Sequence, residues 1–134
     1  MLIKYVKVQR SIQVGADPGI KFLARLFRGN DVSLDQLAEE ISESTTISFP
    51  DVLGMIKVME IMISRHVSNG SAVKLGYLGS FIPAIKAKAQ ETLDMVDAST
   101  IKAFRCRFNA SPEFKRSLAK TGFAEANLEI KGLQ

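Results

Sequence analysis

The sequence contains a single cysteine, a single histidine and no tryptophan among its 134 residues. Cys106 has no partner for a disulfide within the chain, a pattern that fits a reducing cytoplasm. One cysteine and one histidine also cannot supply a Cys/His zinc set. We therefore expect a cytoplasmic protein that holds no metal and no other cofactor.

Long apolar runs are missing as well. The longest nearly apolar stretch, residues 52–63, is interrupted by Lys57 and Glu60 and is much shorter than the roughly 20 residues that span a bilayer. Residues 1–8 mix lysines with apolar side chains and lack the unbroken apolar stretch of a secretory signal. We expect no membrane contact, and an apolar content of 46% is enough for one compact domain.

Catalytic groupings are absent too. His66 lies near the end of a predicted helix, where a helix-terminal or surface role fits better than catalysis. Cys106 stands in an alternating strand pattern and is predicted to point inward as a small core residue, not as an activated nucleophile. The spacing of Gly76 and Gly79 is too short for a phosphate-binding loop. We expect no enzymatic activity and no small-molecule substrate.

Charge is distributed unevenly along the chain. Residues 1–28 carry a net charge of +5, residues 29–66 carry −5, and residues 102–120 carry +5, within an overall charge of +4. If the two basic segments meet in space, they form one positive face suited to a polyanion. The other interpretation is that these charges only solvate the outer faces of strands.

Two helices are predicted in the middle of the chain. Ser33 and Gln36 form a capping-box pattern for a helix that begins at Leu34. A second helix follows Ser48, with a proline in its first turn, and ends at residues 69–70. The first helix has an apolar stripe at positions i, i+3, i+4 and i+7, which are Leu34, Leu37, Ala38 and Ile41.

The second helix is apolar around nearly its whole circumference and must be buried on most sides. A partner subunit could cover part of it, which we favour because a domain of this size has little material to do so. The alternative is a central helix wrapped by its own sheet. Met55, Met59, Met62 and Met95 are interpreted as packing residues. The apolar positions are Val52, Leu53, Met55, Ile56, Val58, Met59, Ile61, Met62, Ile63 and Val67.

Strand patterns flank the helices. Residues 2–9 and 20–28 are predicted strands, although a short helix is an alternative for the latter, and residues 73–85 form a strand interrupted by two glycines. Residues 86–100 have no clear period and are expected to form a protruding arm or a mobile loop. Arg105 and Arg107 alternate with three apolar residues in a half-buried strand. A short helix is expected from Ser111–Pro112, and the tail after Gly122 is expected to be ordered only in part.

The order of these elements and two local motifs resemble the bacterial histone-like HU/IHF proteins. Residues 73–81, Val-Lys-Leu-Gly-Tyr-Leu-Gly-Ser-Phe, match that family's strand signature V-x-L-x-x-x-G-[ST]-F. Residues 108–115, Phe-Asn-Ala-Ser-Pro-Glu-Phe-Lys, align with its closing strand and helix. The resemblance covers residues 32–120, and the segment before it is similar to the N-terminal extension of an enlarged HU-like subfamily.

The resemblance implies an α+β, IHF-like (HU) fold: a helical hairpin, an antiparallel sheet with a β-arm, and a short C-terminal helix, assembled as an intertwined dimer. We divide the chain into an N-terminal β extension (residues 1–31), an HU/IHF-like DNA-binding domain (residues 32–122) and a tail (residues 123–134). The expected dimer contacts are Val52, Ile56, Met59, Ile63, Phe81 and Phe108.

In function, the resemblance implies a homodimeric, nucleoid-associated architectural protein that binds double-stranded DNA with low sequence specificity through a basic β-saddle. The predicted arm departs from the family because no proline lies between Pro83 and Pro112, and its lysines are balanced by acidic residues. A dimeric protein-interaction module that kept the fold and lost DNA binding is therefore the alternative. The predicted DNA contacts are Lys74, Lys86, Lys88, Lys102, Arg105, Arg107, Lys115 and Arg116.

Overall fold

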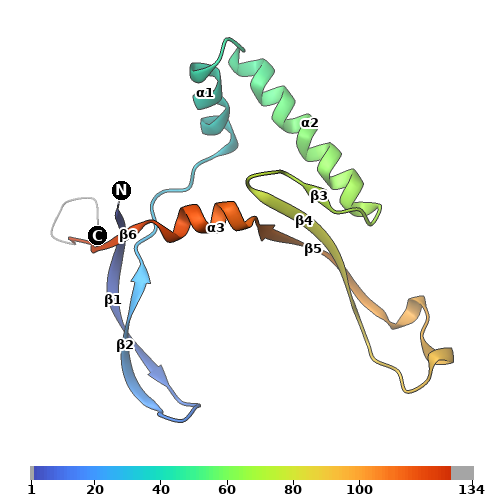
Figure 1. Cartoon of the computed structure of the whole chain (residues 1–134). Helices are drawn as coiled ribbons and strands as arrows, with labels where there is room; N and C mark the ends of the chain where they lie inside the picture. Colours follow the sequence, from blue (N-terminus) through green and yellow to red (C-terminus); the bar gives the residue numbers. More distant parts are fainter. Residues whose placement is uncertain (1, 128–134) are drawn as a thin grey trace. The chain divides into compact units, whose positions relative to one another are not determined.

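The computed structural model describes residues 2–127 and has an α+β fold (Figure 1). Backbone contacts divide it into two units, an N-terminal unit of residues 2–31 and 117–127 and a central unit, Val32–Arg116. The elements are β1 (Leu2–Ile12), β2 (Gly19–Leu26), α1 (Leu34–Ser44), α2 (Phe49–Ser68), β3 (Val73–Lys74), β4 (Gly79–Ala87), β5 (Ile101–Ala110), α3 (Pro112–Ala119) and β6 (Gly122–Glu125), with 3₁₀ turns at Leu93–Met95 and Ala98–Thr100.

The N-terminal unit contains a three-stranded sheet in the order β2-β1-β6. Strands β1 and β2 form an antiparallel hairpin, with pairs running from Tyr5↔Leu26 to Ile12↔Gly19. The connection turns at two glycines with positive φ, Gly15 and Gly19. The predicted strand at residues 20–28 is thus confirmed, because its backbone pairs with β1 and does not close on itself as a helix.

Strand β6 is an element that the sequence did not predict, at the start of the predicted tail. It pairs in parallel with β1, from Leu2↔Gly122 to Tyr5↔Glu125, and Lys7 and Glu125 form an ion pair across the two strands at 3.4 Å. Parallel pairing between segments this far apart in sequence leaves no local turn signal, which is why the sequence does not reveal it. Residues 128–134 of the predicted tail lie outside the described residues, and the division at 31 and 122 stays a prediction.

In the central unit, local capping determines where the helices begin and end. The N–H of Gln36 donates to Ser33 Oγ at 3.1 Å and the N–H of Ser33 donates to Gln36 Oε1 at 3.0 Å, so the predicted capping box is confirmed. Helix α2 has Ser48 as its N-cap and a proline in its first turn, although the Ser48 side chain makes no capping bond. After α2, Gly70 takes a positive φ and its N–H donates to Val67 O at 2.9 Å.

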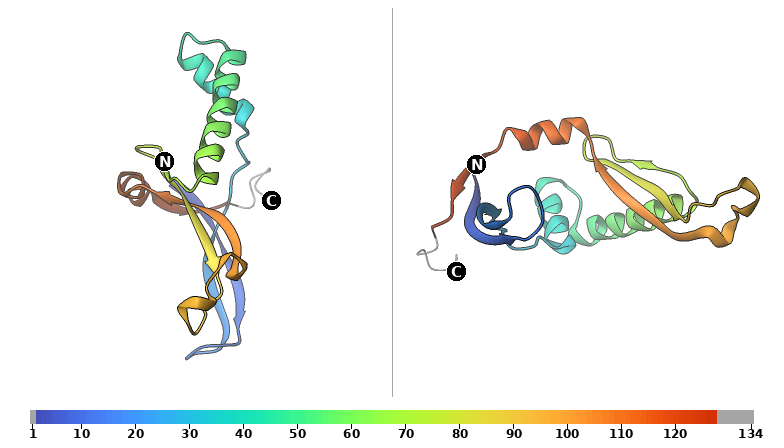
Figure 2. Two further views of the ribbon diagram at one scale, coloured as in Figure 1. Left: turned by 90° about the vertical axis from the view of Figure 1, so that its right-hand side faces the viewer. Right: turned by 90° about the horizontal axis from the view of Figure 1, so that it is seen from below.

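The second sheet has the order β3-β4-β5 and corrects the single strand predicted at residues 73–85. Gly76, at φ +61°, makes a tight turn, and the N–H of Leu75 donates to Gly79 O at 2.7 Å. At Gly79 the neighbouring backbone leaves no room for a side chain, since a Cβ there would lie 2.1 Å from Asn109 O. Strands β4 and β5 run beside each other as a long antiparallel hairpin (Figures 1 and 2).

Little apolar surface is buried. Helix α1 packs against α2, yet only four hydrophobic residues in the described chain are buried: Ala38, Val52, Val67 and Ala126. Helix α2 is not wrapped by its own sheet, because Met55, Val58 and Ile61 remain 52%, 52% and 57% exposed. Cys106, expected inside, is also exposed, because nothing in the described chain covers the face of β5 that carries it.

Candidate nucleic-acid interface

The register of the β4–β5 hairpin assigns each side chain to one of its two faces. Opposite residues of an antiparallel pair project to the same face, and successive residues alternate between faces. The pairs Phe81↔Phe108, Pro83↔Cys106 and Ile85↔Phe104 therefore share one face, and the pairs between them share the other. This confirms the predicted alternation of residues 104–108.

One face of the hairpin is basic. The pairs Ile82↔Arg107, Ala84↔Arg105 and Lys86↔Ala103 project to it. No acidic residue lies on β4 or β5, so nothing on the hairpin strands neutralises these three positive charges. Lys74 extends the same face onto β3, because it pairs with Ser80. We call this surface, made by Lys74, Lys86, Arg105 and Arg107, the basic face of the hairpin.

Two further predicted contacts lie where the hairpin becomes irregular. The register shifts between Lys86 and Ala87, because Lys86 pairs with Ala103 whereas Ala87 pairs with Ile101. Lys102 is the extra residue of this β-bulge. Lys88 lies just beyond β4, and its N–H donates to Thr100 O at 2.8 Å. Both lysines therefore lie at the loop end of the hairpin, beyond its regular pairing.

Helix α3 carries the last two predicted contacts, Lys115 and Arg116. Ser111 connects the start of this helix to the β3–β4 turn, because its hydroxyl donates to Tyr77 O and accepts the N–H of Phe114 at 3.0 Å. The ring centroids of Tyr77 and Phe114 lie 6.0 Å apart. Arg116 forms an ion pair with Glu113 at 3.6 Å, whereas Lys115 has no ion-pair partner in the described chain.

The hairpin loop, residues 88–100, is chemically different from the strands. It contains Glu91, Asp94 and Asp97, and it exposes Leu93 by 86% and Val96 by 56%. Hydrogen bonds that the Ser99 hydroxyl and N–H donate to the Asp97 carboxylate lower the pKa of Asp97. The loop therefore presents negative charge and apolar side chains in the segment where the family resemblance implies a basic tip.

The predicted dimer residues divide by exposure. Val52 is only 2% exposed within its own chain and offers little area to a partner, whereas Met59 and Phe108 are 48% and 49% exposed. Phe108 packs against Phe81, with ring centroids 5.3 Å apart. Ile56 and Ile63 are half-buried. The predicted dimer contacts do not include six other exposed apolar residues of α2, β4 and β5: Met55, Val58, Ile61, Met62, Ile85 and Phe104.

An open groove of about 390 Å³ lies between the end of α2 and the apolar face of the hairpin. Its lining includes Ile63 and Val67 from α2, Phe81 from β4 and Cys106 from β5. The apolar residues around α2 indicate that much of this helix must be covered, and the exposed ones mark the part that its own chain leaves uncovered. The sequence predicts an apolar helix but does not tell which side of it stays exposed.

Within residues 2–127, no group of three or more His, Cys, Asp or Glu side chains is arranged to hold a metal ion. Over the same residues, no helix combines the length and the apolar character that crossing a membrane requires.

Comparisons with known proteins identify the fold. A crystal structure from Bacteroides vulgatus ATCC 8482, described as a "putative bacterial DNA binding protein", matches with a TM-score of 0.65 and 14% identity, over 92% of this chain and 47% of that one. The chain thus spans about half the length of that relative. No curated protein matches. The model of the HU-HIG family, described as an HU domain fused to wHTH, Ig, or a glycine-rich motif, matches residues 1–125. The predicted HU resemblance is confirmed, and the chain belongs to the HU-HIG family of HU-domain proteins.

Proposed function

We propose that this chain is an architectural DNA-binding protein of the nucleoid that binds duplex DNA with low sequence specificity. The observation that carries the proposal is the basic face of the hairpin, where Lys86, Arg105 and Arg107 share one side of two strands that contain no acidic residue. Arginine and lysine side chains bind phosphates without reading base sequence. The hairpin would act as the β-arm, and Lys102, Lys88, Lys115 and Arg116 would add contacts at its two ends.

We further propose that the DNA-binding form is a homodimer. The outer stripe of α2, formed by Met55, Val58 and Met62 at i, i+3 and i+7, is 52%, 52% and 42% exposed. Together with the groove beside Cys106, it forms an apolar surface continuous with the predicted dimer residues. Soluble proteins rarely leave such an apolar surface uncovered. A second copy would also bring a second basic face to the same DNA.

Fluorescence anisotropy at several salt concentrations tests DNA binding, with one intact duplex and one nicked duplex. Arg105→Ala/Arg107→Ala removes four phosphate contacts per dimer, so the slope of log affinity against log salt should fall by about 3 to 4. The matched control Lys7→Ala/Lys57→Ala removes the same charge from β1 and α2, and should change the slope by less than about 1. Absence of wild-type binding at low salt would overturn the proposal.

Sedimentation velocity tests the dimer. Met55→Glu/Met62→Glu would bury unpaired carboxylates in the proposed interface, costing about 3 kcal/mol or more and shifting the protein to monomer at micromolar concentration. The matched control Gln9→Glu/Gln13→Glu adds two carboxylates at exposed positions outside α2 and should leave the dimer intact. A wild-type protein that sediments as a monomer would exclude the homodimer.

The hairpin loop supports one alternative, a dimeric protein-interaction module. Its acidic residues and the exposed Leu93, Met95 and Val96 are unsuited to a phosphate-lined groove. The anisotropy experiment distinguishes a DNA-binding protein from a protein-interaction module. Leu93→Ser/Val96→Ser should leave DNA affinity within about twofold if the strands carry binding, whereas a protein-interaction module would show no salt-dependent DNA binding at all.

A further inference from the structure

The N-terminal unit has a basic surface of its own, formed on β1 and β2. Alternation along β1 and its register with β2 place Lys4, Arg10, Lys21 and Arg25 on one side of the sheet. We call these four residues the basic face of the N-terminal sheet. No acidic residue of β1, β2 or β6 projects to this side.

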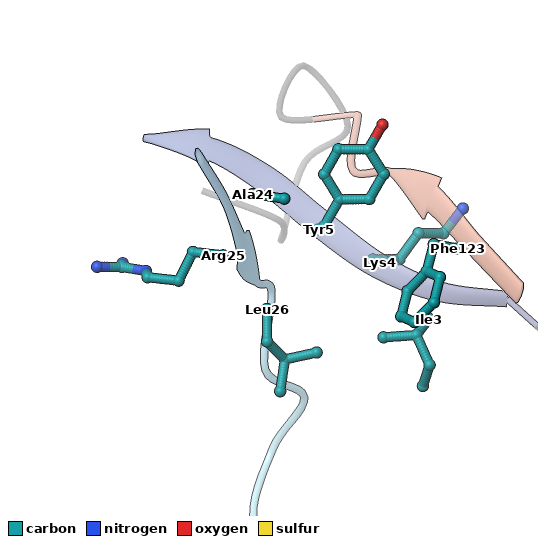
Figure 3. Close-up of a pocket in the computed structure, with 7 residues that line it drawn as sticks. All are labelled: Ile3, Lys4, Tyr5, Ala24, Arg25, Leu26 and Phe123. Carbon is teal, nitrogen blue, oxygen red and sulfur yellow. The ribbon is translucent and has the colours of Figure 1, made fainter. Parts of the chain in front are cut away.

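The opposite side of the same sheet has a different character. It holds the neutralised pair Lys7 and Glu125 together with Ile3, Phe123 and Leu26. These three apolar residues line an open hollow of about 430 Å³, which Lys4 and Arg25 of the basic face also line (Figure 3). Aromatic residues that strengthen protein interfaces lie on this apolar side, because Phe22 pairs with Gln9 and Phe123 pairs with Ile3. The basic face therefore lacks the aromatic anchors expected of a protein-docking surface.

The charges of the basic face are only slightly compensated within the described chain. Lys4, Arg10 and Arg25 take part in no ion pair there, and Lys21 alone has a partner, Asp17, at 2.7 Å. Arg10 and Lys21 are direct cross-strand neighbours, an arrangement in which like charges destabilise the pair. A bound polyanion would remove this repulsion, because its phosphates would lie between the two side chains.

We infer that this face is a second DNA-phosphate contact surface, used in addition to the hairpin. The inference rests on the proposed DNA-binding function and assigns a role to the N-terminal unit. Lys4 and Arg10 are six residues apart on an extended strand, a span of about 20 Å, which corresponds to about six base pairs of a duplex. Such a row lengthens the bound DNA segment and contributes salt-dependent affinity without base recognition.

The test compares full-length variants by anisotropy on a duplex long enough to extend beyond the hairpin contacts, and by hydroxyl-radical footprinting. Lys4→Gln/Arg10→Gln/Arg25→Gln should lower the salt slope by about 3 per bound chain, weaken binding at least tenfold near 0.1 M salt, and shorten the footprint by several base pairs. The matched control Lys7→Gln/Lys57→Gln/Lys120→Gln removes equal charge from other surfaces and should leave the footprint unchanged. The variant Arg10→Lys/Arg25→Lys, which keeps both positive charges, should bind DNA as the wild type does.

The outcomes separate this inference from the proposed function. If the triple variant behaves like its matched control while Arg105→Ala/Arg107→Ala weakens binding, the N-terminal face is not a DNA surface and the hairpin function stands. If the wild type binds no DNA, both fail. If the triple variant binds DNA normally but loses binding to poly-L-glutamate, the face belongs to an acidic protein partner and the inference is overturned. Circular dichroism melting of each variant excludes unfolding as the cause.

Discussion

The protein contains two three-stranded sheets that each carry basic residues on one side but differ in how closely they pack. In the hairpin sheet, β4 and β5 approach so closely at Gly79 that no side chain fits, and Phe81 and Phe108 pack ring against ring. In the N-terminal sheet, Phe22 and Phe123 are 75% and 71% exposed and pack against little of their own chain.

This difference in packing indicates how far each sheet depends on contacts with other molecules. The hairpin sheet has internal packing that keeps the two strands of its basic face in position before any ligand binds. The N-terminal sheet has Arg10 opposite Lys21, and its apolar side is largely uncovered. Its two sides are therefore better suited to binding than to stabilising their own unit, and four experiments with six substitutions can test this contrast.

The largest effect is expected from two strand glycines. Gly79→Ala places a Cβ 2.1 Å from Asn109 O at a φ of +146°, and should lower the free energy of unfolding by about 3 kcal/mol or more. Gly122→Ala meets only the tip of the Leu2 side chain at 2.8 Å, which can move aside, so its cost should stay below about 0.5 kcal/mol. Urea unfolding at one fixed protein concentration measures both. Equal losses would remove the contrast between the sheets.

The next effect concerns one phenylalanine from each sheet. Phe108→Ala removes the ring that packs on Phe81 and should cost about 2 kcal/mol, since half of the side chain is covered. Phe123→Ala, at 71% exposure, should cost less than about 0.5 kcal/mol. The same urea series reports both values. A larger loss for Phe123→Ala would mean that its hollow is covered in the assembled protein.

A smaller effect, of opposite sign, is expected at the like-charged pair. Arg10→Glu places an acid opposite Lys21, and should raise the free energy of unfolding by about 0.2–1 kcal/mol while weakening DNA binding. Thermal unfolding and anisotropy on the same sample measure the two consequences. A variant that is neither more stable nor weaker in DNA binding would contradict the role assigned to this pair.

The smallest effect is expected in the hairpin loop. Hydrogen bonds from Ser99 lower the pKa of Asp97 below its ordinary value of 3.8, so the turn they form is complete above that value and is lost as pH falls through the lowered pKa. The protection factor of the Ser99 N–H, which donates to Asp97 at 2.9 Å, is its exchange rate compared with the intrinsic rate at the same pH, and it should fall as pH drops through the lowered pKa. Asp97→Ala should remove this protection at every pH above that value. A wild-type protection factor no higher than that of Asp97→Ala would show that the turn is open.

Features governed by nearby residues could be predicted from the sequence. The capping pair of Ser33 and Gln36 defines the start of α1, and the alternation from Phe104 to Phe108 correctly predicts the two faces of β5. The family signature at residues 73–81 was recognisable, but the structure is a turn between two strands, because Gly76 reverses the chain at φ +61°. A glycine alone does not distinguish a turn from a bulge.

Features that depend on distant residues were not predictable. Residues 122–125 have no helix, turn or strand signal strong enough to indicate that they pair with β1. The exposure of Cys106 also could not be foreseen, because alternation places it on the apolar face and says nothing of what covers that face. The sequence alternation correctly placed Arg105 and Arg107 on the same face of β5. The bulge at Lys102 could be recognised only from the register of β4 with β5.

The parallel pairing of β6 with β1 has a consequence for synthesis of the chain. Strand β1 leaves the ribosome early and soon pairs with β2, but its other edge must wait for residues 120 positions later, since Leu2 pairs with Gly122 and Tyr5 with Glu125. At typical elongation rates of roughly 5–20 residues per second, that edge stays open for about 6 to 24 seconds in each nascent chain. An open strand edge readily pairs with other chains. The lysines and arginines of β1 would repel neighbouring nascent copies during this interval, which gives the same charges a protective role before the protein is complete.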